Sequence, residues 1–176
     1  VPVTMSNTVN LVNANGLIVV RPGGLVKAAH FHVWDLYQNH LGSSPLQASV
    51  TAPSRTVSLR LGAEIVRSTG ECRTRPAVVS MLDVSATLSE DRRTYKVAVI
   101  NRSATDDIAA DLSLDGRPVS GTATLRQIGA GVDDLYAWNS MDEPDRVTLS
   151  EASEVEIDGE FVFPAHSISL VEWPVG

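Results

Sequence analysis

The 176-residue sequence is poor in cysteine, in aromatic residues and in positive charge. Its one cysteine, Cys72, excludes an internal disulfide framework and a zinc cage built from cysteines. No run of eighteen apolar residues is present, so the sequence offers no candidate transmembrane helix. The 14 basic and 21 acidic residues give a net charge of −7. That balance argues against nucleic-acid binding, because neutralising phosphates needs clustered Lys and Arg.

Four catalytic sequence motifs are also missing. The sequence contains no Gly-x-Ser-x-Gly nucleophile elbow, no Gly-x-x-x-x-Gly-Lys phosphate loop, no Gly-x-Gly-x-x-Gly dinucleotide loop and no His-Glu-x-x-His zinc motif. His30 and His32 are two residues apart, so on a helix their side chains point in different directions. We therefore expect no metal site and no cofactor.

What is present is typical of a globular protein. The composition is 43% apolar and 20% charged, and the length suits one domain, or one domain with a fragment attached. The chain begins at Val1, and its first residues have neither the basic region nor the apolar region of a signal peptide. We expect a piece of a longer protein and a cytoplasmic location.

The first 44 residues combine helical and extended patterns. Residues 6–14 and 27–41 have apolar residues at helical spacing, and the second stretch is followed by Gly42 as a cap. Between them, residues 17–20 are a wholly apolar run that suits the interior of a parallel sheet or barrel, and residues 21–24 break it. Helix, strand, loop and helix would form the end of an α/β unit, which is no domain by itself.

From residue 46 onward, short strands alternate with turn residues. Antiparallel strands with such turns indicate a β-sandwich or jelly roll. The expected strands span residues 46–51, 57–61, 77–88, 94–101, 107–114, 121–128, 154–157, 160–163 and 166–173.

Acidic residues gather near the C-terminus. Residues 133–160 hold ten acids and one base, Arg146. We interpret this stretch as a solvated face. A calcium site is an alternative, although the spacing and central glycine of a calcium loop are missing. A glycosidase pair of carboxylates is another, but nothing marks two of the ten. Cys72, beside Arg73, is interpreted as an incidental thiol rather than a nucleophile.

The few aromatic side chains are candidates for stacking on sugar rings. Trp34 lies in the expected second helix and Trp173 in the last expected strand, so both are assigned to the core. Tyr136 and Trp138 lie in an expected loop and are the better candidates for an exposed platform.

Three groups of residues follow one another in a specific order. The first group is NLVN at 10–13 with PGG at 22–24 and HVWDLY at 32–37. The second group is YKVAVINRS at 95–103. The third group is DLYAWN at 134–139 with EPDRV at 143–147 and FPAHSISL at 163–170. Together they resemble the C-terminal portion of family 51 glycoside hydrolases, the α-L-arabinofuranosidases. The resemblance covers nearly the whole chain.

This resemblance implies a mainly β fold. An antiparallel β-sandwich (jelly roll) in residues 45–176 would follow the last helix–strand–helix of an incomplete (β/α)8 barrel in residues 1–44. In family members, a short N-terminal strand of the full enzyme also joins the sandwich. Here that strand would be missing, which would leave an unpaired edge.

The family hydrolyses glycosides with retention, using two glutamates on barrel strands four and seven. Both positions lie upstream of Val1, and no glutamate of this chain sits in a matching motif, so we assign no catalytic residue. One sugar contact is implied at Asn10, which aligns with a glutamine that hydrogen-bonds arabinose in some members. Asparagine is one methylene shorter than that glutamine.

The leading hypothesis is the C-terminal sandwich of an α-L-arabinofuranosidase, inactive alone. Its partners would be the catalytic barrel of the same polypeptide and, through the intact enzyme, arabinan, arabinoxylan or their oligosaccharides. The intact enzyme would be a homo-oligomer. One alternative is a stand-alone carbohydrate-binding module that uses Tyr136 and Trp138. Another is an interaction sandwich with an exposed apolar patch or a free edge strand.

Overall fold

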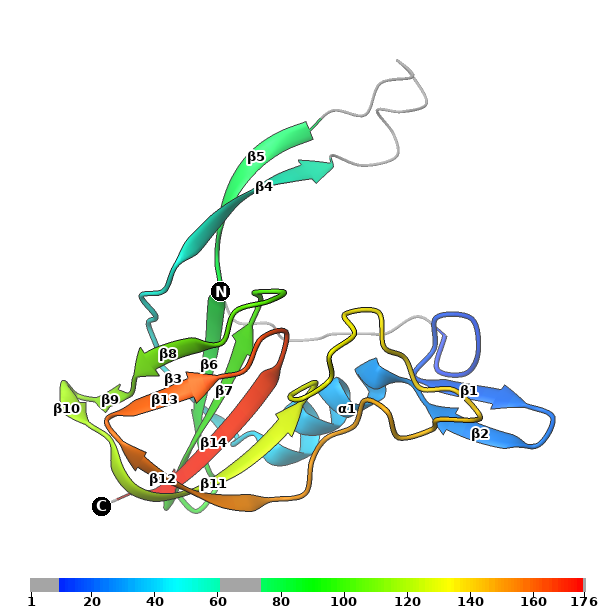
Figure 1. The fold of residues 1–176 in the computed structure, drawn as a ribbon. Helices are drawn as coiled ribbons and strands as arrows, with labels where there is room; N and C mark the ends of the chain where they lie inside the picture. Colours follow the sequence, from blue (N-terminus) through cyan, green and yellow to red (C-terminus); the bar gives the residue numbers. More distant parts are fainter. Residues whose placement is uncertain (1–9, 61–73, 176) are drawn as a thin grey trace.

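A six-stranded antiparallel sheet forms the centre of the computed structural model, which describes residues 10–60 and 74–175 (Figure 1). The strand order across the sheet is β12-β11-β14-β7-β6-β3. Its strands are β3 (Ser44–Leu46), β6 (Leu82–Leu88), β7 (Thr94–Asn101), β11 (Ser120–Ile128), β12 (Ser153–Asp158) and β14 (Ile168–Pro174).

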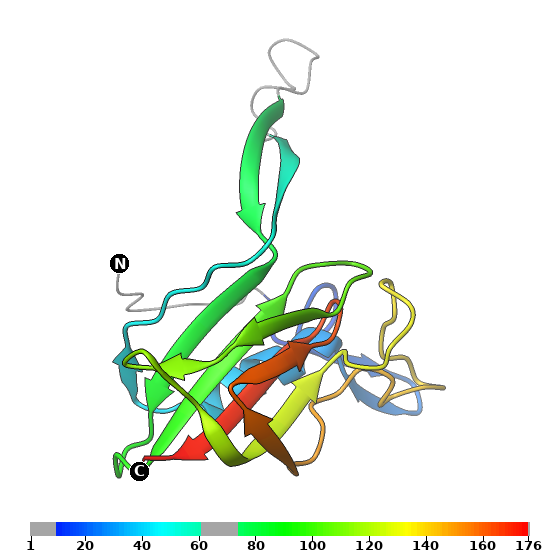
Figure 2. The same ribbon diagram turned by 60° about the vertical axis from the view of Figure 1, so that its left-hand side comes forward.

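Four short strands form a second layer over one face of this sheet (Figure 2). β8 (Ile108–Asp111) pairs with β13 (Glu160–Phe163), and β9 (Ser113–Leu114) pairs with β10 (Arg117–Pro118). The two layers together form a β-sandwich and bury the main core between them. The buried residues of this core are Leu82, Val99, Val119, Ala123, Ile157, Phe163 and Val171.

A short helical segment packs on the opposite face of the six-stranded sheet. It consists of α1 (Ala29–Asp35) and one π-helical turn, η1 (Leu36–His40). Leu36 is fully buried in a second apolar cluster with Ala98 of β7 and Leu170 of β14. Strands β7 and β14 therefore have a packed neighbour on both faces, which explains why their sequences are apolar at successive positions.

The chain turns sharply after η1 to enter β3. At Gly42 a Cβ atom would lie 2.1 Å from the carbonyl oxygen of Leu88, so only glycine fits this approach to the end of β6. The Gly42 amide donates to Oγ1 of Thr87. Gly42 thus lets the helical segment dock against the sheet, in addition to the helix-ending role that its sequence position indicates.

Two strands stand apart from the rest of the fold. β4 (Ser54–Arg60) and β5 (Thr74–Ser80) pair with each other as a separate two-stranded sheet. In Figures 1 and 2 this ribbon rises away from the body. We call β4 and β5 the arm.

The predicted fold class is confirmed: the chain is mainly β, with antiparallel sheets forming a sandwich. The predicted strand over residues 77–88 divides at Met81 into β5 and β6, because the chain leaves the arm there and enters the six-stranded sheet. Cys72 lies outside the described residues. None of the helices in the described ranges is both long and apolar enough to cross a membrane.

The helix–strand–helix pattern predicted for residues 1–44 is not confirmed. Of the first predicted helix, over residues 6–14, residues 6–9 lie outside the described ranges, and residues 10–14 are not helical, with positive φ at Asn10, Asn13 and Ala14. The apolar run forms β1 (Ile18–Arg21), which pairs antiparallel with β2 (Gly24–Lys27). Its residues are therefore half of a hairpin, because the Pro-Gly pair predicted to break the strand reverses the chain instead.

Candidate functional site

The acidic stretch lies at the surface. Each of its ten carboxylate residues is exposed. Arg146 bridges two of them, Asp134 at 3.2 Å and Glu143 at 3.5 Å. The exposure agrees with a solvated face. It does not fit a glycosidase acid, whose carboxyl group needs a desolvated setting to stay protonated near neutral pH. Within residues 10–60 and 74–175 no three His, Cys, Asp or Glu side chains converge as a metal site.

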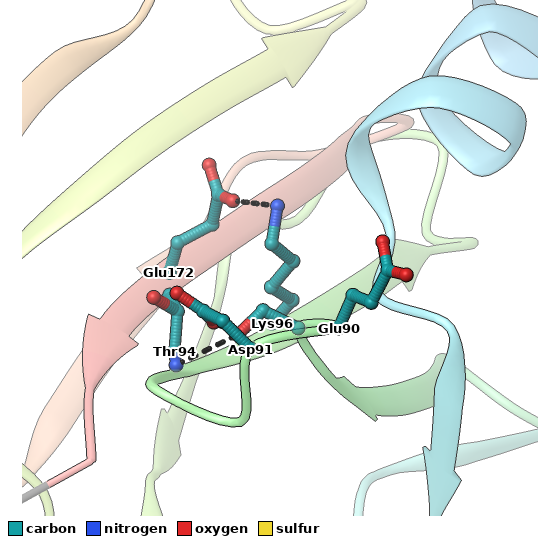
Figure 3. Close-up of a pocket in the computed structure, with 6 residues that line it drawn as sticks. Glu90, Asp91, Thr94, Lys96 and Glu172 are labelled. Atoms are coloured by element: carbon teal, nitrogen blue, oxygen red, sulfur yellow. Dashed lines mark hydrogen bonds and ion pairs between the residues drawn. The ribbon is translucent and has the colours of Figure 1, made fainter.

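A shallow depression at one end of the sheet is lined by three carboxylate side chains and one ammonium group (Figure 3). Lys96 of β7 reaches Glu172 of β14 at 2.6 Å, and both side chains are mostly buried, with 20% and 14% exposed. The Lys96 ammonium also donates to the carbonyl oxygen of His40 at 2.8 Å. This ion pair therefore holds the end of η1 against the sheet.

The other two carboxylates of the depression belong to the turn between β6 and β7. Ser89 donates to Asp91 at 2.6 Å, and the amide of Arg93 donates to the same carboxylate. The hydrogen bond from Ser89, followed by the one from Arg93, holds the pKa of Asp91 below its usual value. The neighbouring Glu90 is exposed. With Asp91 occupied in the turn and Glu172 occupied by Lys96, the depression provides no free pair of carboxylates for catalysis.

Asn139 is a buried polar side chain in the loop between β11 and β12. It is 4% exposed. Its amide nitrogen donates to the carbonyl oxygens of Lys27 at 2.9 Å and Val147 at 2.8 Å, and its carbonyl oxygen accepts the Val147 amide at 2.7 Å. Lys27 lies in β2, whereas Val147 lies in the long loop between β11 and β12. Asn139 thus ties the β1–β2 hairpin to the sandwich, and we call this junction the seam.

Two other residues from the resemblance motifs also act as loop ties. Asn101, 1% exposed, donates to the carbonyl oxygens of Asp106 and Phe163 and accepts the amide of Ser103, each at 2.9 Å. The ring nitrogens of His166 lie 3.2 Å and 2.5 Å from the carbonyl oxygens of Ala104 and Val132. The motif residues Asn101, Asn139 and His166 therefore have structural partners.

These three residues stand in the motifs of the sequence, but the motifs alone predict no role for any of them. Each partner is a backbone group on a distant loop, and periodicity carries no information about such groups. In the sequence, the only sign of a role for these residues is their place in the ordered motifs. An asparagine that is buried at such a place needs hydrogen-bond partners for its amide and carbonyl groups.

The imidazole of His32 is buried beside the seam. The side chain is 8% exposed, and its Nε2 atom has no hydrogen-bond partner in the part of the chain that the structure describes. Burial, followed by the nearby charge of Lys27, lowers the pKa of His32, and the carboxylates of Asp35 and Asp145 oppose that shift. His32 is thus a packed side chain of α1 rather than a surface residue.

We expect His32 to make the fold sensitive to acid. Because the pKa of His32 is lowered in the folded state, the neutral ring is favoured there, and the unfolded chain takes up its proton first as pH falls. Stability should therefore be complete above the unfolded pKa of about 6.5 and decline as pH falls through the folded value. The measurement is the thermal midpoint between pH 7.5 and pH 5.5.

His32→Leu should reduce this dependence, because the apolar side chain cannot be protonated. His30→Gln is the matched control, since His30 is exposed on the same helix. Equal pH slopes for wild type and His32→Leu would contradict the expectation.

The aromatic candidates differ in exposure, and Trp34, which was expected in the core, belongs to neither apolar cluster. Tyr136 is 88% exposed and Trp138 is 67% exposed, and both lie in the loop that leads to Asn139. Trp173 is half-buried against Tyr95, with ring centroids 5.9 Å apart, and Trp34 is half-buried on α1. Tyr136 and Trp138 are thus the two large aromatic side chains available at this surface.

Asn10, the predicted sugar contact, is exposed in the turn before β1. Its φ of 62° places it in the left-handed region, where asparagine is tolerated more readily than most residues. Its role in binding stays a prediction.

Comparisons with known proteins give one consistent result. A family model described as the α-L-arabinofuranosidase C-terminal domain matches residues 2–167. A search of the curated proteins found no match.

Several solved structures share the fold. An arabinose complex of α-L-arabinofuranosidase from Thermotoga maritima superposes with a TM-score of 0.75 at 24% identity, over 94% of this chain and 33% of that one. The thermostable family 51 enzyme from Thermotoga petrophila RKU-1 gives 0.73 at 24% identity, over 93% and 32%. The family 51 enzyme from Xanthomonas axonopodis pv. citri gives 0.67 at 19% identity, over 92% and 29%. This chain spans about a third of the length of these enzymes.

Proposed function

Because the chain belongs to the family of α-L-arabinofuranosidase C-terminal domains, we propose that it supports the catalytic barrel of such an enzyme within one polypeptide. The intact enzyme would release terminal α-L-arabinofuranosyl groups from arabinan or arabinoxylan. Residues 1–44 would complete the barrel and residues 45–176 would form the sandwich. The intact protein would be a cytoplasmic homo-oligomer, and Asn10 would approach the bound arabinose.

The seam is the observation that carries this proposal. Asn139 joins the β1–β2 hairpin to the sandwich by buried hydrogen bonds. On its N-terminal side, the chain exposes large apolar side chains, with Val12 47%, Val20 43% and Leu25 58% exposed. Apolar groups gathered on one segment are typical of a surface that another part of the protein covers. A catalytic barrel preceding residue 10 would cover them.

The open side of the sandwich supports the family's extra strand. β8 pairs with β13 on one edge only, among the strands described. Next to it, a hollow between the layers is lined by core side chains, which include Val84, Val97 and Leu112. An extended segment from the N-terminal end of a longer polypeptide would fill this hollow and give β8 a second partner.

Catalysis would depend on residues that this chain does not contain. Retaining hydrolysis needs a nucleophile and an acid/base carboxyl about 5 Å apart, held where they stabilise the oxocarbenium-like transition state. We therefore expect the chain alone to be inactive. In the intact enzyme, deletion of residues 45–176 should impair the barrel by exposing its apolar contact surface.

The test is an assay with an aryl α-L-arabinofuranoside on two proteins, the 176-residue chain and a longer polypeptide that carries a family 51 barrel before it. We expect release of the aryl group only from the longer polypeptide. Turnover by the chain alone would contradict the proposal, and the catalytic pair would then have to be sought among the exposed carboxylates of the chain. An inactive longer polypeptide that is folded by circular dichroism would contradict it as well.

The exposure of Tyr136 and Trp138 favours a second candidate function, binding of carbohydrate by the sandwich itself. Two uncovered aromatic rings separated by one residue can stack on the C–H faces of sugar rings. Trp138→Ala should then weaken binding of arabino-oligosaccharides by about fivefold, if the stacking contributes on the order of 1 kcal/mol. Isothermal titration calorimetry measures this change.

Trp173→Phe is the control for that experiment, because Trp173 is half-buried and should affect folding more than binding. If neither wild type nor Trp138→Ala binds the oligosaccharides, the proposal of carbohydrate binding by the sandwich is wrong. The proposal that the chain supports a catalytic barrel is not affected by that result.

A further inference from the structure

The arm has an architecture that normally requires a partner. Its strands pair with each other from Ser54 opposite Ser80 to Arg60 opposite Thr74. Among the described residues, no strand of the body pairs with either. At its base the Met81 amide donates to the carbonyl oxygen of Pro53. A two-stranded ribbon without a further layer is marginally stable in water. The arm projects from the body in both views (Figures 1 and 2).

Both faces of the arm carry β-branched or apolar residues. Residues directly opposite each other in an antiparallel pair share a face. One face therefore holds Val57 with Ala77, and the other holds Val78 with Thr56. Val78 is 73% exposed. Apolar side chains this far from the core gain stability only when another surface covers them.

The two outer edges of the arm differ. Pro76 of β5 has no amide hydrogen to donate, so a further strand cannot form a continuous ladder along β5. β4 contains no proline over its seven residues. The available edge for strand addition is therefore that of β4.

Charge indicates what would cover the arm. The fourteen residues of β4 and β5 contain three arginines and no acid, a charge of +3. The whole chain carries −7, so the remainder carries −10. Two arms would repel each other, whereas an arm and the body of another copy attract.

The matching edge on the body is β12. This strand lies at one end of the six-stranded sheet and, among the strands of residues 10–60 and 74–175, pairs only with β11. Ile157 is buried, while Glu154, Glu156 and Asp158 are exposed. The sheet's other edge strand, β3, has three residues, whereas β12 has six. β12 therefore offers an edge of nearly the length of β4, with the opposite charge.

We propose that the β4 edge of the arm docks on the β12 edge of a second copy of this chain, so that Arg55 of β4 and, one strand behind it, Arg75 of β5 lie on the side of Glu154 and Glu156. Each copy contributes one arm and one edge, so a two-fold axis closes the pair and leaves neither β4 edge unpaired. The proposal deepens the self-association proposed above. It is independent of the proposed catalytic role, which the arabinofuranoside assay tests separately.

The first test is sedimentation velocity of the 176-residue chain at 50 mM and 500 mM NaCl. We expect a dimer at low salt and a weaker one at high salt, because opposite charges at the surface are screened. The double variant Arg55→Glu/Arg75→Glu should raise the dimer dissociation constant by about 100-fold, since like charges then face each other. The variant Arg117→Glu makes the same charge change on exposed β10 and should leave the dimer unchanged.

Charge exchange gives the decisive measurement. Glu154→Lys/Glu156→Lys should also be monomeric, because its edge repels the wild-type arm. When this variant is mixed with Arg55→Glu/Arg75→Glu, both arm–edge contacts become complementary again. A heterodimer should then form. Circular dichroism confirms that each variant is folded before mixing.

Three outcomes would overturn the proposal: a wild-type monomer at low salt, a dimer that tolerates both charge reversals, or two folded monomeric variants that fail to associate on mixing. A dimer insensitive to the reversals would place the interface on another surface, such as the seam.

Discussion

Asn139→Asp is expected to destabilise the fold by about 3–5 kcal/mol. The substitution keeps the size of the side chain but replaces the donating amide nitrogen by a carboxylate oxygen. That oxygen would face the carbonyl oxygens of Lys27 and Val147, which now accept hydrogen bonds at 2.9 and 2.8 Å. A buried charge without a donor has a cost of this order. Urea denaturation followed by circular dichroism measures the change.

The matched control is Asn15→Asp. Asn15 is exposed in the turn before β1, so the same chemical change should alter stability by no more than about 0.5 kcal/mol. Hydrogen exchange adds a second readout, because loosening of the seam should increase exchange in β2. If Asn139→Asp and Asn15→Asp have the same urea midpoint of unfolding, the seam contributes little to stability. The proposal that the chain supports a catalytic barrel then loses its main argument.

Phe163→Ala should reduce stability by a similar amount, about 3–5 kcal/mol, through a different cause. Phe163 is 1% exposed in the core between the two layers, and its ring meets Phe161 edge-on with centroids 5.0 Å apart. Truncation removes buried apolar surface and leaves a cavity that the sheets can close only in part. Since domains of this size are stable by about 5–15 kcal/mol, such a loss approaches global unfolding.

Val162→Ala provides the comparison on the same strand. Val162 is 49% exposed and points away from the core, so its truncation should have a small effect. The thermal midpoint by scanning calorimetry measures both variants. A loss for Phe163→Ala no larger than that for Val162→Ala would mean that the second layer contributes little to holding the sandwich together.

The two substitutions test different parts of the molecule. Phe163→Ala weakens the packing of one layer on the other, whereas Asn139→Asp weakens the attachment of the β1–β2 hairpin. Hydrogen exchange should therefore increase throughout the sheets in the first variant. In the second variant, it should increase first around β2 and the loop that contains Asn139.

The strands were largely predictable because their evidence is local. In β7 and β14, alternate side chains enter different apolar clusters, as with Val99 and Ala98 or Val171 and Leu170. That alternation is imposed by the two-residue repeat of a strand and is visible in any window of the sequence. The ordered motifs added the family, which the match over residues 2–167 confirms.

The first 44 residues were predicted less well, for a reason that is also physical. Residues 10–14 have helical apolar spacing, yet Asn13 and Ala14 adopt left-handed backbone angles that end any helix. The Asn13 side chain accepts the amide of Val20 at 2.7 Å, a contact that stabilises the turn. Helical spacing is a weak preference, and a side-chain contact of this kind overrides it.

The sequence by itself thus determined the fold class, the strands and the family, since each depends on short-range periodicity or on the order of motifs. Only the tertiary structure decided what the motif residues do. The amide of Asn139 meets a carbonyl oxygen 112 residues away, and the amide of Asn101 meets one 62 residues away. Such partners are chosen by folding, because a buried polar group takes whichever backbone atoms the packed strands bring to it.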